Sequence, residues 1–507
     1  MLLDVTAFLS TSASINSVAE AFSVSETLQA SISSPVELTA DRAAWNAALE
    51  SAGSTPVVLP APRFAAPRSA AAGNSAATDN PWNGVPQPFV GPVPGTSKVS
   101  FDVLPTLTGA PLLTQLSLLT PSQLSDFVAS NPQSVTALIA TPPSASVVES
   151  WWGQADHDTQ AALLTSAPQL IGSLEGVPYG TRDVANRRFL ADSEQAIQDQ
   201  LNSGVGRAEQ QDLKTSLHML EQVGLALTVG TSGNARELIL LDPAGQGRAV
   251  IAIGDLASAD YVNYLVPGMF SSVDTQIVAA ADKTDEFATD QQRMLATLPA
   301  PTGDAATPAA ATASHTPTVA AIAWLGYHSP SIVDVASMDL AREGQQALTQ
   351  SLQGLVSLRG AHQPYLAIIA HSYGSTAALL SLQDDQVSVD ALAIIGSPGS
   401  PATSVSDLKV RDGNVWVGAA ALDPVPQTGI FGSQPLSPQY GAHHFSVDGA
   451  VDPQTGQALT PALGHNDYFV TGTESMHNME LVGIGRGDLV LGNDGAAALA
   501  GKALAIG

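Results

Sequence analysis

A serine at the apex of a strand–turn–helix pattern is the residue of this chain best placed for chemistry. The stretch Tyr365–Leu380 reads Y-L-A-I-I-A-H-S-Y-G-S-T-A-A-L-L: an apolar run, a short turn around Ser372, then a helix pattern of small residues. In a nucleophile elbow the residues two before and two after the serine are small, because strand and helix pass close together, and here they are Ala370 and Gly374. Ser372 is therefore a candidate nucleophile, exposed above the sheet and facing the positive N-terminal end of the helix.

The pentapeptide alone carries little information. In a chain so rich in Ala, Gly and Ser, roughly one small-x-Ser-x-Gly match is expected by chance. A serine nucleophile also needs a base to take its proton and an acid to hold and offset that base. In the hydrolases that use this elbow, the order along the chain is Ser, then Asp or Glu, then His.

Two downstream residues fit those roles. Asp423 follows the apolar run Val415–Ala419 and precedes Pro424, which ends regular structure. His465 stands in A-L-G-H-N-D-Y-F, on a loop led by glycine and followed by an aromatic pair. The order Ser372, Asp423, His465 is the one found in the hydrolases that use this elbow.

Simpler roles stay open for both residues, since an Asp-Pro pair after a strand commonly forms a turn and a loop histidine commonly lies at the surface. His371 precedes the nucleophile, so its side chain should point away from the apex and act as a supporting group. Other candidates for the base are His443, His444 and His477, and for the acid Asp448 and Asp452.

The oxyanion formed during acyl transfer needs two backbone N–H donors. One is expected from Tyr373, after the nucleophile, and the other from Gly268 or Met269, in the loop after the third strand. Gly268 lets the backbone approach a substrate oxygen closely, although a plain Pro-Gly turn would look the same.

Five aromatic residues are expected to line the substrate pocket, because they lie near strand ends or in the segment before His465. They are Phe270, Trp324, Tyr327, Phe431 and Tyr440.

The composition excludes several other classes. Asp and Glu outnumber Lys and Arg 46 to 19, and the resulting net charge of −27 repels nucleic acids and anionic membranes as partners. There is no cysteine, so disulfides and thiolate chemistry are excluded. No apolar run approaches the ~18 residues of a membrane span. No basic leader is visible, and the compartment stays open. The sequence does not indicate the oligomeric state either. We expect no metal and no cofactor.

The chain divides by composition into four parts. Residues 1–55 are predicted to be a helical segment, 56–100 a Pro/Ala/Ser-rich linker, 101–230 a helical domain and 231–507 the catalytic domain, with a cap insertion at about 424–463. A 36-residue echo within 120–178 predicts two copies of a helix–turn–helix unit.

The catalytic part is predicted to be an α/β fold. Glu237–Leu241 and Ala249–Ile253 read as a hairpin, after which apolar strands alternate with helix patterns. Such alternation favours one mostly parallel central sheet flanked by helices.

From about Trp151 to Gly485 the chain resembles the actinobacterial α/β-hydrolase family of uncharacterised function. The resemblance rests on W-W, L-I-G-S-L-E-G-V-P, R-D-V-A-N-R, V-P-G-M, I-A-W-L-G-Y, A-H-S-Y-G-S, L-D-P-V and G-H-N-D-Y-F. It implies the α/β-hydrolase fold with Ser372, Asp423 and His465 as the triad. The elbow opens with Ala370 where the family commonly has glycine.

These observations predict a serine hydrolase that cleaves a small-molecule or lipid-like carboxylic ester. An amidase or peptidase with the same triad is an alternative, and so is a non-catalytic binding module built on the hydrolase fold. A fluorophosphonate probe would label Ser372 in both enzymes and not in the binding module.

Overall fold

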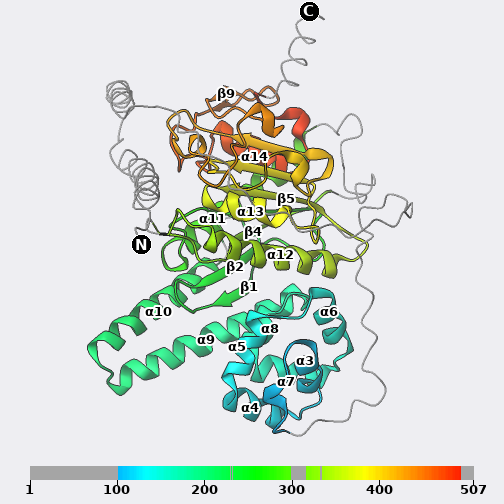
Figure 1. Ribbon diagram of the computed structural model, residues 1–507, viewed down its shortest axis with the longest axis vertical. Coiled ribbons are helices and arrows are strands. Elements are labelled where there is room, and N and C mark those ends of the chain that lie inside the picture. The colour runs from blue at the N-terminus through cyan, green and yellow to red at the C-terminus, as the bar shows by residue number, and fades with distance from the viewer. Residues whose placement is uncertain (1–100, 229, 231, 299–315, 332–333, 493–507) are drawn as a thin grey trace, which may run out of the picture. The chain divides into compact units, whose positions relative to one another are not determined.

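The computed structural model describes residues 101–492, apart from 229, 231, 299–315 and 332–333 (Figure 1). The predicted helical segment 1–55 and linker 56–100 lie outside these described residues.

An eight-stranded sheet forms the centre of the described chain (Figure 1). Its strands are β1 (Arg236–Asp242), β2 (Arg248–Ile253), β3 (Tyr261–Val266), β4 (Val319–Leu325), β5 (Tyr365–His371), β6 (Ala391–Ile395), β7 (Val415–Gly418) and β8 (His443–His444). They lie in the order β1-β2-β4-β3-β5-β6-β7-β8, with β2 antiparallel to both β1 and β4 and every other pair parallel. β5 therefore lies inside the sheet, between β3 and β6, with both its edges paired.

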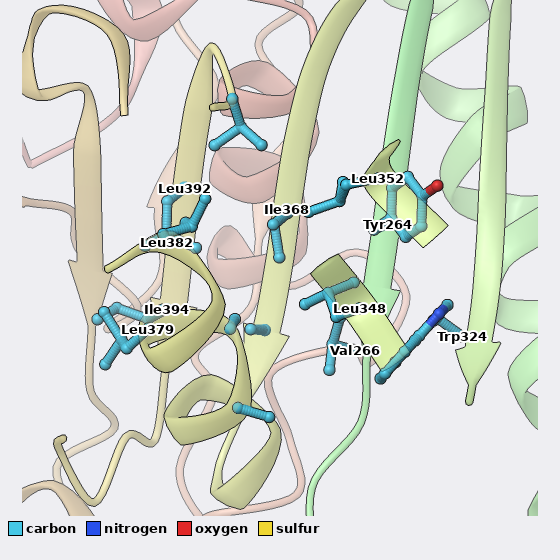
Figure 2. Packing of buried hydrophobic residues seen from close by; sticks show 14 of the residues in the cluster. Tyr264, Val266, Trp324, Leu348, Leu352, Ile368, Leu379, Leu382, Leu392 and Ile394 are labelled. Carbon is cyan, nitrogen blue, oxygen red and sulfur yellow. The ribbon is translucent and has the colours of Figure 1, made fainter. Parts of the chain in front are cut away.

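Helices cover both faces of the sheet, because neighbouring residues of a strand point to opposite sides. On β3, Tyr264 and Val266 pack in one cluster with α12 (Asp339–Arg359) and α13 (Tyr373–Leu382), as Figure 2 shows. Tyr261 and Leu265 pack in a second cluster on the other face, with residues of α11 (Val273–Thr297) and α14 (Glu474–Gly483). Burial on both faces explains why these strands read as continuous apolar runs.

The described residues before β1 are mainly helical. The helices are α3 (Gly109–Leu116), α4 (Pro121–Ser130), α5 (Pro132–Ala140), α6 (Ala145–Gln154), α7 (His157–Ser166), α8 (Pro168–Ser173), α9 (Tyr179–Ser203) and α10 (Arg207–Ala226). The predicted repeat is confirmed, since α7 and α8 follow α4 and α5 at a spacing of 36 residues. The linking residues Asn131 and Ala167 also share one conformation, with φ −132°, ψ 54° and φ −137°, ψ 50°.

Buried polar contacts join this helical region to the sheet. The Asn186 side chain on α9 donates to the carbonyls of Gly172 (3.0 Å) and Leu238 (2.8 Å), so one fully buried amide links α8, α9 and β1. Arg182, also on α9, forms a buried ion pair with Glu175. Buried polar groups are stable only when paired in this way.

The segment 424–463 lies partly in the main core. It contains the short 3₁₀ turns η4 (Val425–Gln427) and η5 (Pro438–Tyr440), the edge strand β8, and a separate pair of strands, β9 (Ala450–Val451) and β10 (Ala458–Leu459). Its Phe431 and Tyr440 belong to the core cluster over α12 and α13. The segment therefore extends the sheet and its core, and a role as a cap over the site stays a prediction. Four further 3₁₀ turns are η1 (Leu104–Thr106), η2 (Val405–Asp407), η3 (Arg411–Gly413) and η6 (Gly487–Leu489).

A mostly parallel sheet with antiparallel strands at one edge, helices on both faces and a sharp turn from β5 into a helix is the α/β-hydrolase fold. The predicted fold class is confirmed.

Candidate active site

Ser372 occupies a strained turn between β5 and α13. Its backbone angles are φ 54° and ψ −131°, a conformation that a residue with a Cβ adopts only at a cost. The Ser372 N–H donates to the Ile395 carbonyl on β6 (3.0 Å), and the Ser375 hydroxyl donates to the Ser372 carbonyl (2.5 Å). These bonds hold the turn. Ser372 is only 1% exposed, so the prediction that it stands exposed above the sheet is wrong.

The loop after β3 lies directly against this turn. A Cβ added at Gly374 would lie 2.2 Å from the Pro267 carbonyl oxygen, and one added at Gly268 would lie 2.5 Å from the Ser372 Cβ. Two glycines therefore allow the loop after β3 to approach the turn at Ser372 closely. Gly268 lies against the Ser372 side chain and Tyr373 begins α13 beside it, and their role as oxyanion donors stays a prediction.

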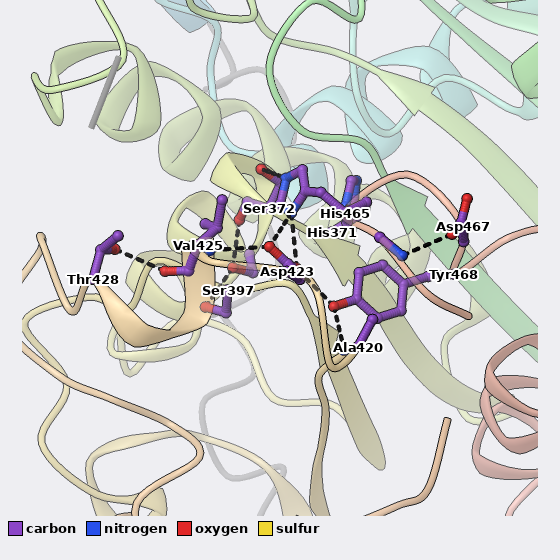
Figure 3. Close-up of polar contacts among 12 residues, drawn as sticks. His371, Ser372, Ser397, Ala420, Asp423, Val425, Thr428, His465, Asp467 and Tyr468 are labelled. Atoms are coloured by element: carbon purple, nitrogen blue, oxygen red, sulfur yellow. Dashed lines mark hydrogen bonds and ion pairs between the residues drawn. The ribbon is translucent and has the colours of Figure 1, made fainter. Parts of the chain in front are cut away.

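One chain of hydrogen bonds connects the serine, the histidine and the aspartate (Figure 3). His465 Nε2 lies 2.8 Å from Ser372 Oγ, and His465 Nδ1 lies 2.9 Å from both carboxylate oxygens of Asp423. All three residues are buried, although they come from three separate loops. In this arrangement Nδ1–H donates to the carboxylate, and Nε2 accepts a hydrogen bond from the Ser372 hydroxyl.

Asp423 is held ionised by three donors. Besides His465, the Tyr468 hydroxyl donates to its Oδ2 (2.6 Å) and the Val425 N–H to its Oδ1 (3.0 Å). Burial opposes ionisation of Asp423, yet the hydrogen bond and charge of His465, with the bonds from Tyr468 and Val425, bring its pKa below the usual value. The Asp423 carboxylate is therefore charged at neutral pH.

His371 supports His465 at its backbone and its ring. Its Nε2–H donates to the His465 carbonyl (2.8 Å), and the two rings lie 4.6 Å apart between centroids. Burial, together with the nearby charge of His465, lowers the pKa of His371 to about 3. The His371 ring is therefore neutral at neutral pH, and its effect on His465 comes from the hydrogen bond and the ring contact.

The alternative bases and acids lie elsewhere. His443 and His444 are exposed on β8, where His443 stacks on Trp416. His477 is on α14, and Asp452 bonds within its own turn to Gln454 and Thr455. Asp448 is exposed, and its N–H is bonded to Ser446.

The aromatic residues expected around the substrate are mostly core residues. Trp324 and Tyr327 stack on each other with 5.8 Å between centroids, both nearly fully buried, and Tyr440 is buried in the same cluster. Phe431 packs edge-on against the Tyr373 ring at 5.7 Å. Phe270, by contrast, is 36% exposed on the wall of a groove. Nearness to a strand end does not say which way a ring points, and Trp324 faces α12.

Tyr468 is the site residue that sequence analysis missed. It lies three residues after His465, inside the stretch G-H-N-D-Y-F, and is fully buried. The signal was present, because an aromatic hydroxyl so close to the base needs a buried partner.

Sequence comparisons assign the family. The model of a family described as Alpha/beta hydrolase matches residues 242–433. The "Uncharacterized protein Mb0988c" of Mycobacterium bovis is 32% identical over 248 residues, covering 47% of this chain and 84% of that protein. The "Uncharacterized protein Rv2079" of Mycobacterium tuberculosis is 26% identical over 410 residues. That match covers 71% of this chain and 59% of the relative, so the chain spans less than two thirds of the relative's length.

The fold and elbow define a protein of the α/β-hydrolase class, and the comparisons agree. The chain belongs to the alpha/beta hydrolase family, with mycobacterial relatives, as the resemblance predicted.

Two esterases are similar among solved structures. A carboxyl esterase of Tuber melanosporum matches at TM-score 0.29 and 11% identity, covering 52% of this chain and 89% of its own. An esterase of Pseudomonas putida matches at TM-score 0.27 and 10% identity, covering 59% and 97%. With such TM-scores, the family assignment rests on the sequence matches and the sheet topology.

Among the described residues, no helix is long and apolar enough to cross a membrane. The same residues contain no group of three or more His, Cys, Asp or Glu side chains that could hold a metal ion.

Proposed function

We propose that the protein is a serine hydrolase that cleaves carboxylic esters, with Ser372 as nucleophile, His465 as base and Asp423 as the acid that orients it. The observation that carries the proposal is the continuous hydrogen-bond chain from Ser372 Oγ through both nitrogens of His465 to Asp423. A lone serine in a strained turn would not need a base and an ionised carboxylate arranged in line behind it.

The reaction would be acyl transfer. His465 Nε2 removes the proton as Ser372 Oγ attacks the ester carbonyl, and Asp423 stabilises the imidazolium that forms. The backbone N–H groups of Tyr373 and of Gly268 or Met269 would donate to the oxyanion. His465 then returns the proton to the leaving alcohol, and a water activated by the same imidazole releases the acyl group.

Covalent labelling tests the nucleophile. A fluorophosphonate probe is expected to label the wild type and to leave Ser372→Ala unlabelled. Ser381→Ala is the matched control, since Ser381 is a buried serine on the same helix whose hydroxyl bonds to Thr349, away from the triad. A wild type that resists the probe would contradict the proposal and favour a binding module.

Turnover separates esters from amides. We expect p-nitrophenyl esters to be hydrolysed at least about 10³-fold faster by the wild type than by Ser372→Ala or His465→Ala. Matched p-nitroanilides are the comparison. Anilide turnover equal to that of the esters, relative to their uncatalysed rates, would point to an amidase or peptidase.

A further inference from the structure

An open groove of about 530 Å³ lies beside the proposed site. Its walls come from α10, the turn between β1 and β2, the loop after β3 with the start of α11, and the loop after β4. Because β2 runs antiparallel to β4, the β1–β2 turn and the carboxyl ends of β3 and β4 meet at one edge of the sheet. Ser372 follows β5 at this same edge.

Phe270 connects this groove to the nucleophile. It is two residues after Gly268, which lies against Ser372, and two residues of chain span at most about 7 Å. Its N–H also donates to the Pro330 carbonyl (3.3 Å), which joins the loops after β3 and β4. Phe270 on the groove wall therefore lies within about 7 Å of Gly268, the residue that lies against Ser372.

The conformation of Phe270 indicates a function. Its φ is 58°, in the region that favours glycine, yet it is a bulky residue whose ring is 36% exposed. Neither backbone preference nor burial accounts for phenylalanine here, and such strain is typical of ligand-binding positions. The strained backbone presents an aromatic ring to the groove.

The walls define the chemistry of the ligand. The apolar side chains of Phe270 and Met219 line the groove, and among its described lining residues there is no Lys or Arg and one carboxylate, that of Asp274. Six hydroxyl groups line it as well, those of Thr215, Ser216, Ser272, Thr275, Ser329 and Ser331. Those of Thr215, Ser272 and Ser331 already donate within the protein and can still accept a hydrogen bond from a ligand. An anionic group would meet a carboxylate and no cation, whereas an uncharged group with an apolar body and a hydroxyl end finds both kinds of partner.

We propose that this groove binds one substituent of the ester substrate, an uncharged chain that carries a hydroxyl or ether oxygen away from the reacting carbonyl. The inference rests on the proposed function and adds the substrate class. The substituent can belong to the acyl part or to the alcohol part, and the test distinguishes the two.

Three p-nitrophenyl esters that differ only at the far end test the class: 6-hydroxyhexanoate, heptanoate and the adipate monoester, with acetate as the short reference. We expect kcat/KM for the hydroxy ester to match or exceed that for heptanoate, and to exceed that for the anionic adipate at least about tenfold. Acetate esters of hexane-1,6-diol and heptan-1-ol repeat the comparison on the alcohol side. The series that responds identifies the part bound. A preference for adipate, or for the methyl end over the hydroxyl end by more than tenfold in both series, overturns the proposed class.

A variant and its control test whether the substituent binds in this groove. Ser216→Trp fills the groove from α10. The ratio of kcat/KM for the responding long ester to that for its short reference should then fall about tenfold, the reference being p-nitrophenyl acetate in the acyl series and ethyl acetate in the alcohol series. His218→Trp is the matched control, because His218 is exposed on the same helix and two residues along, about 200° around the axis. Equal ratios in the two variants would overturn the placement.

Phe270→Gly separates function from folding. Glycine relieves the positive φ, so the midpoint of thermal unfolding should stay level or rise while the long-to-acetate ratio falls about tenfold. A lower midpoint with an unchanged ratio would mean that Phe270 is a structural residue.

If the wild type hydrolyses neither acetate nor longer esters, both proposals fail. If it hydrolyses acetate and the variants leave the ratio unchanged, the groove proposal alone fails.

Discussion

At the scale of single residues, the proposed base is fixed on two sides. His371 holds its backbone carbonyl, and Asp423 holds Nδ1 of its ring. Tyr468 in turn holds Asp423 while accepting the Ala420 N–H (2.8 Å). Such supporting bonds fix the orientation of a reacting imidazole, and each makes a measurable prediction.

Tyr468→Phe should alter the pH dependence of the reaction. Without the hydroxyl, Asp423 loses one of the three donors that hold its pKa below the usual value, so the pKa of Asp423 rises. We expect the acidic limb of the kcat/KM profile to move to higher pH and kcat/KM at neutral pH to fall about tenfold. Tyr440→Phe is the control, because Tyr440 is buried and its hydroxyl has no hydrogen-bond partner among the described residues. A profile that coincides with the wild type would exclude this role for Tyr468.

His371 should make folding sensitive to acid. Its pKa is about 3 in the folded chain and near 6.5 when unfolded, so the unfolded state binds the extra proton first as pH falls. The contribution of His371 to the free energy of unfolding is fully present above pH 6.5 and is lost progressively as the pH falls toward 3. We expect the urea midpoint to drop more between pH 7.5 and 5.0 in the wild type than in His371→Asn, which keeps a donor without titrating. Equal drops would contradict the prediction.

At the scale of elements, the elbow depends on close approach between the β3 loop and α13. The missing Cβ of Gly374 leaves room for the Pro267 carbonyl. The approach of the β3 loop to α13 therefore depends on the absence of a side chain at Gly374.

Gly374→Ala should push the β3 loop away from the nucleophile. We expect a loss of about 1–3 kcal/mol in the free energy of unfolding and a fall in kcat of about 10², since one oxyanion donor moves out of reach. Gly153→Ala on α6 is the control, because no atom lies within 4 Å of its added Cβ. It should leave both quantities unchanged or slightly raise stability. Kinetics and urea denaturation of both variants measure the difference.

Local patterns predicted the elements well. β1 and β2 lie within one residue of their predicted bounds, because Glu237–Leu241 and Ala249–Ile253 are apolar runs joined by a turn sequence. The triad candidates followed from the order of three short motifs. Groove walls such as Ser216 were not predicted, since an ordinary serine on an amphipathic helix carries no sign of the loop that it faces. The support from His371 and Tyr468 likewise depends on packing between residues far apart in the chain.

At the scale of the whole described chain, the helical region and the sheet share buried polar contacts. Asn186 bonds to carbonyls on both sides, and Arg187 on the same helix donates to the Arg236 carbonyl of β1 (2.6 Å). Helices α3–α10 should therefore unfold together with the sheet.

Asn186→Ala tests this coupling. Two buried carbonyls lose their donor, and we expect the free energy of unfolding to fall by about 1–3 kcal/mol. Tryptophan fluorescence, which includes Trp151 and Trp152 in the helical region, and catalytic activity should decline at one shifted urea concentration. Asn202→Ala, an exposed asparagine on the same helix, should change stability by less than about 0.5 kcal/mol. Separate transitions for the two signals would show independent units.

The backbone bond from the Leu422 N–H to the Leu463 carbonyl (3.1 Å) closes the intervening segment at its base, next to Asp423 and His465. Acid and base are thus fastened to each other and, through His371, to the strand that carries the nucleophile. Because this bond lies at the base of the segment, a change of length at its outer turns would leave Asp423 and His465 together. If the proposed roles hold, a protein engineer could therefore alter substrate preference at these outer turns without moving the proposed acid and base.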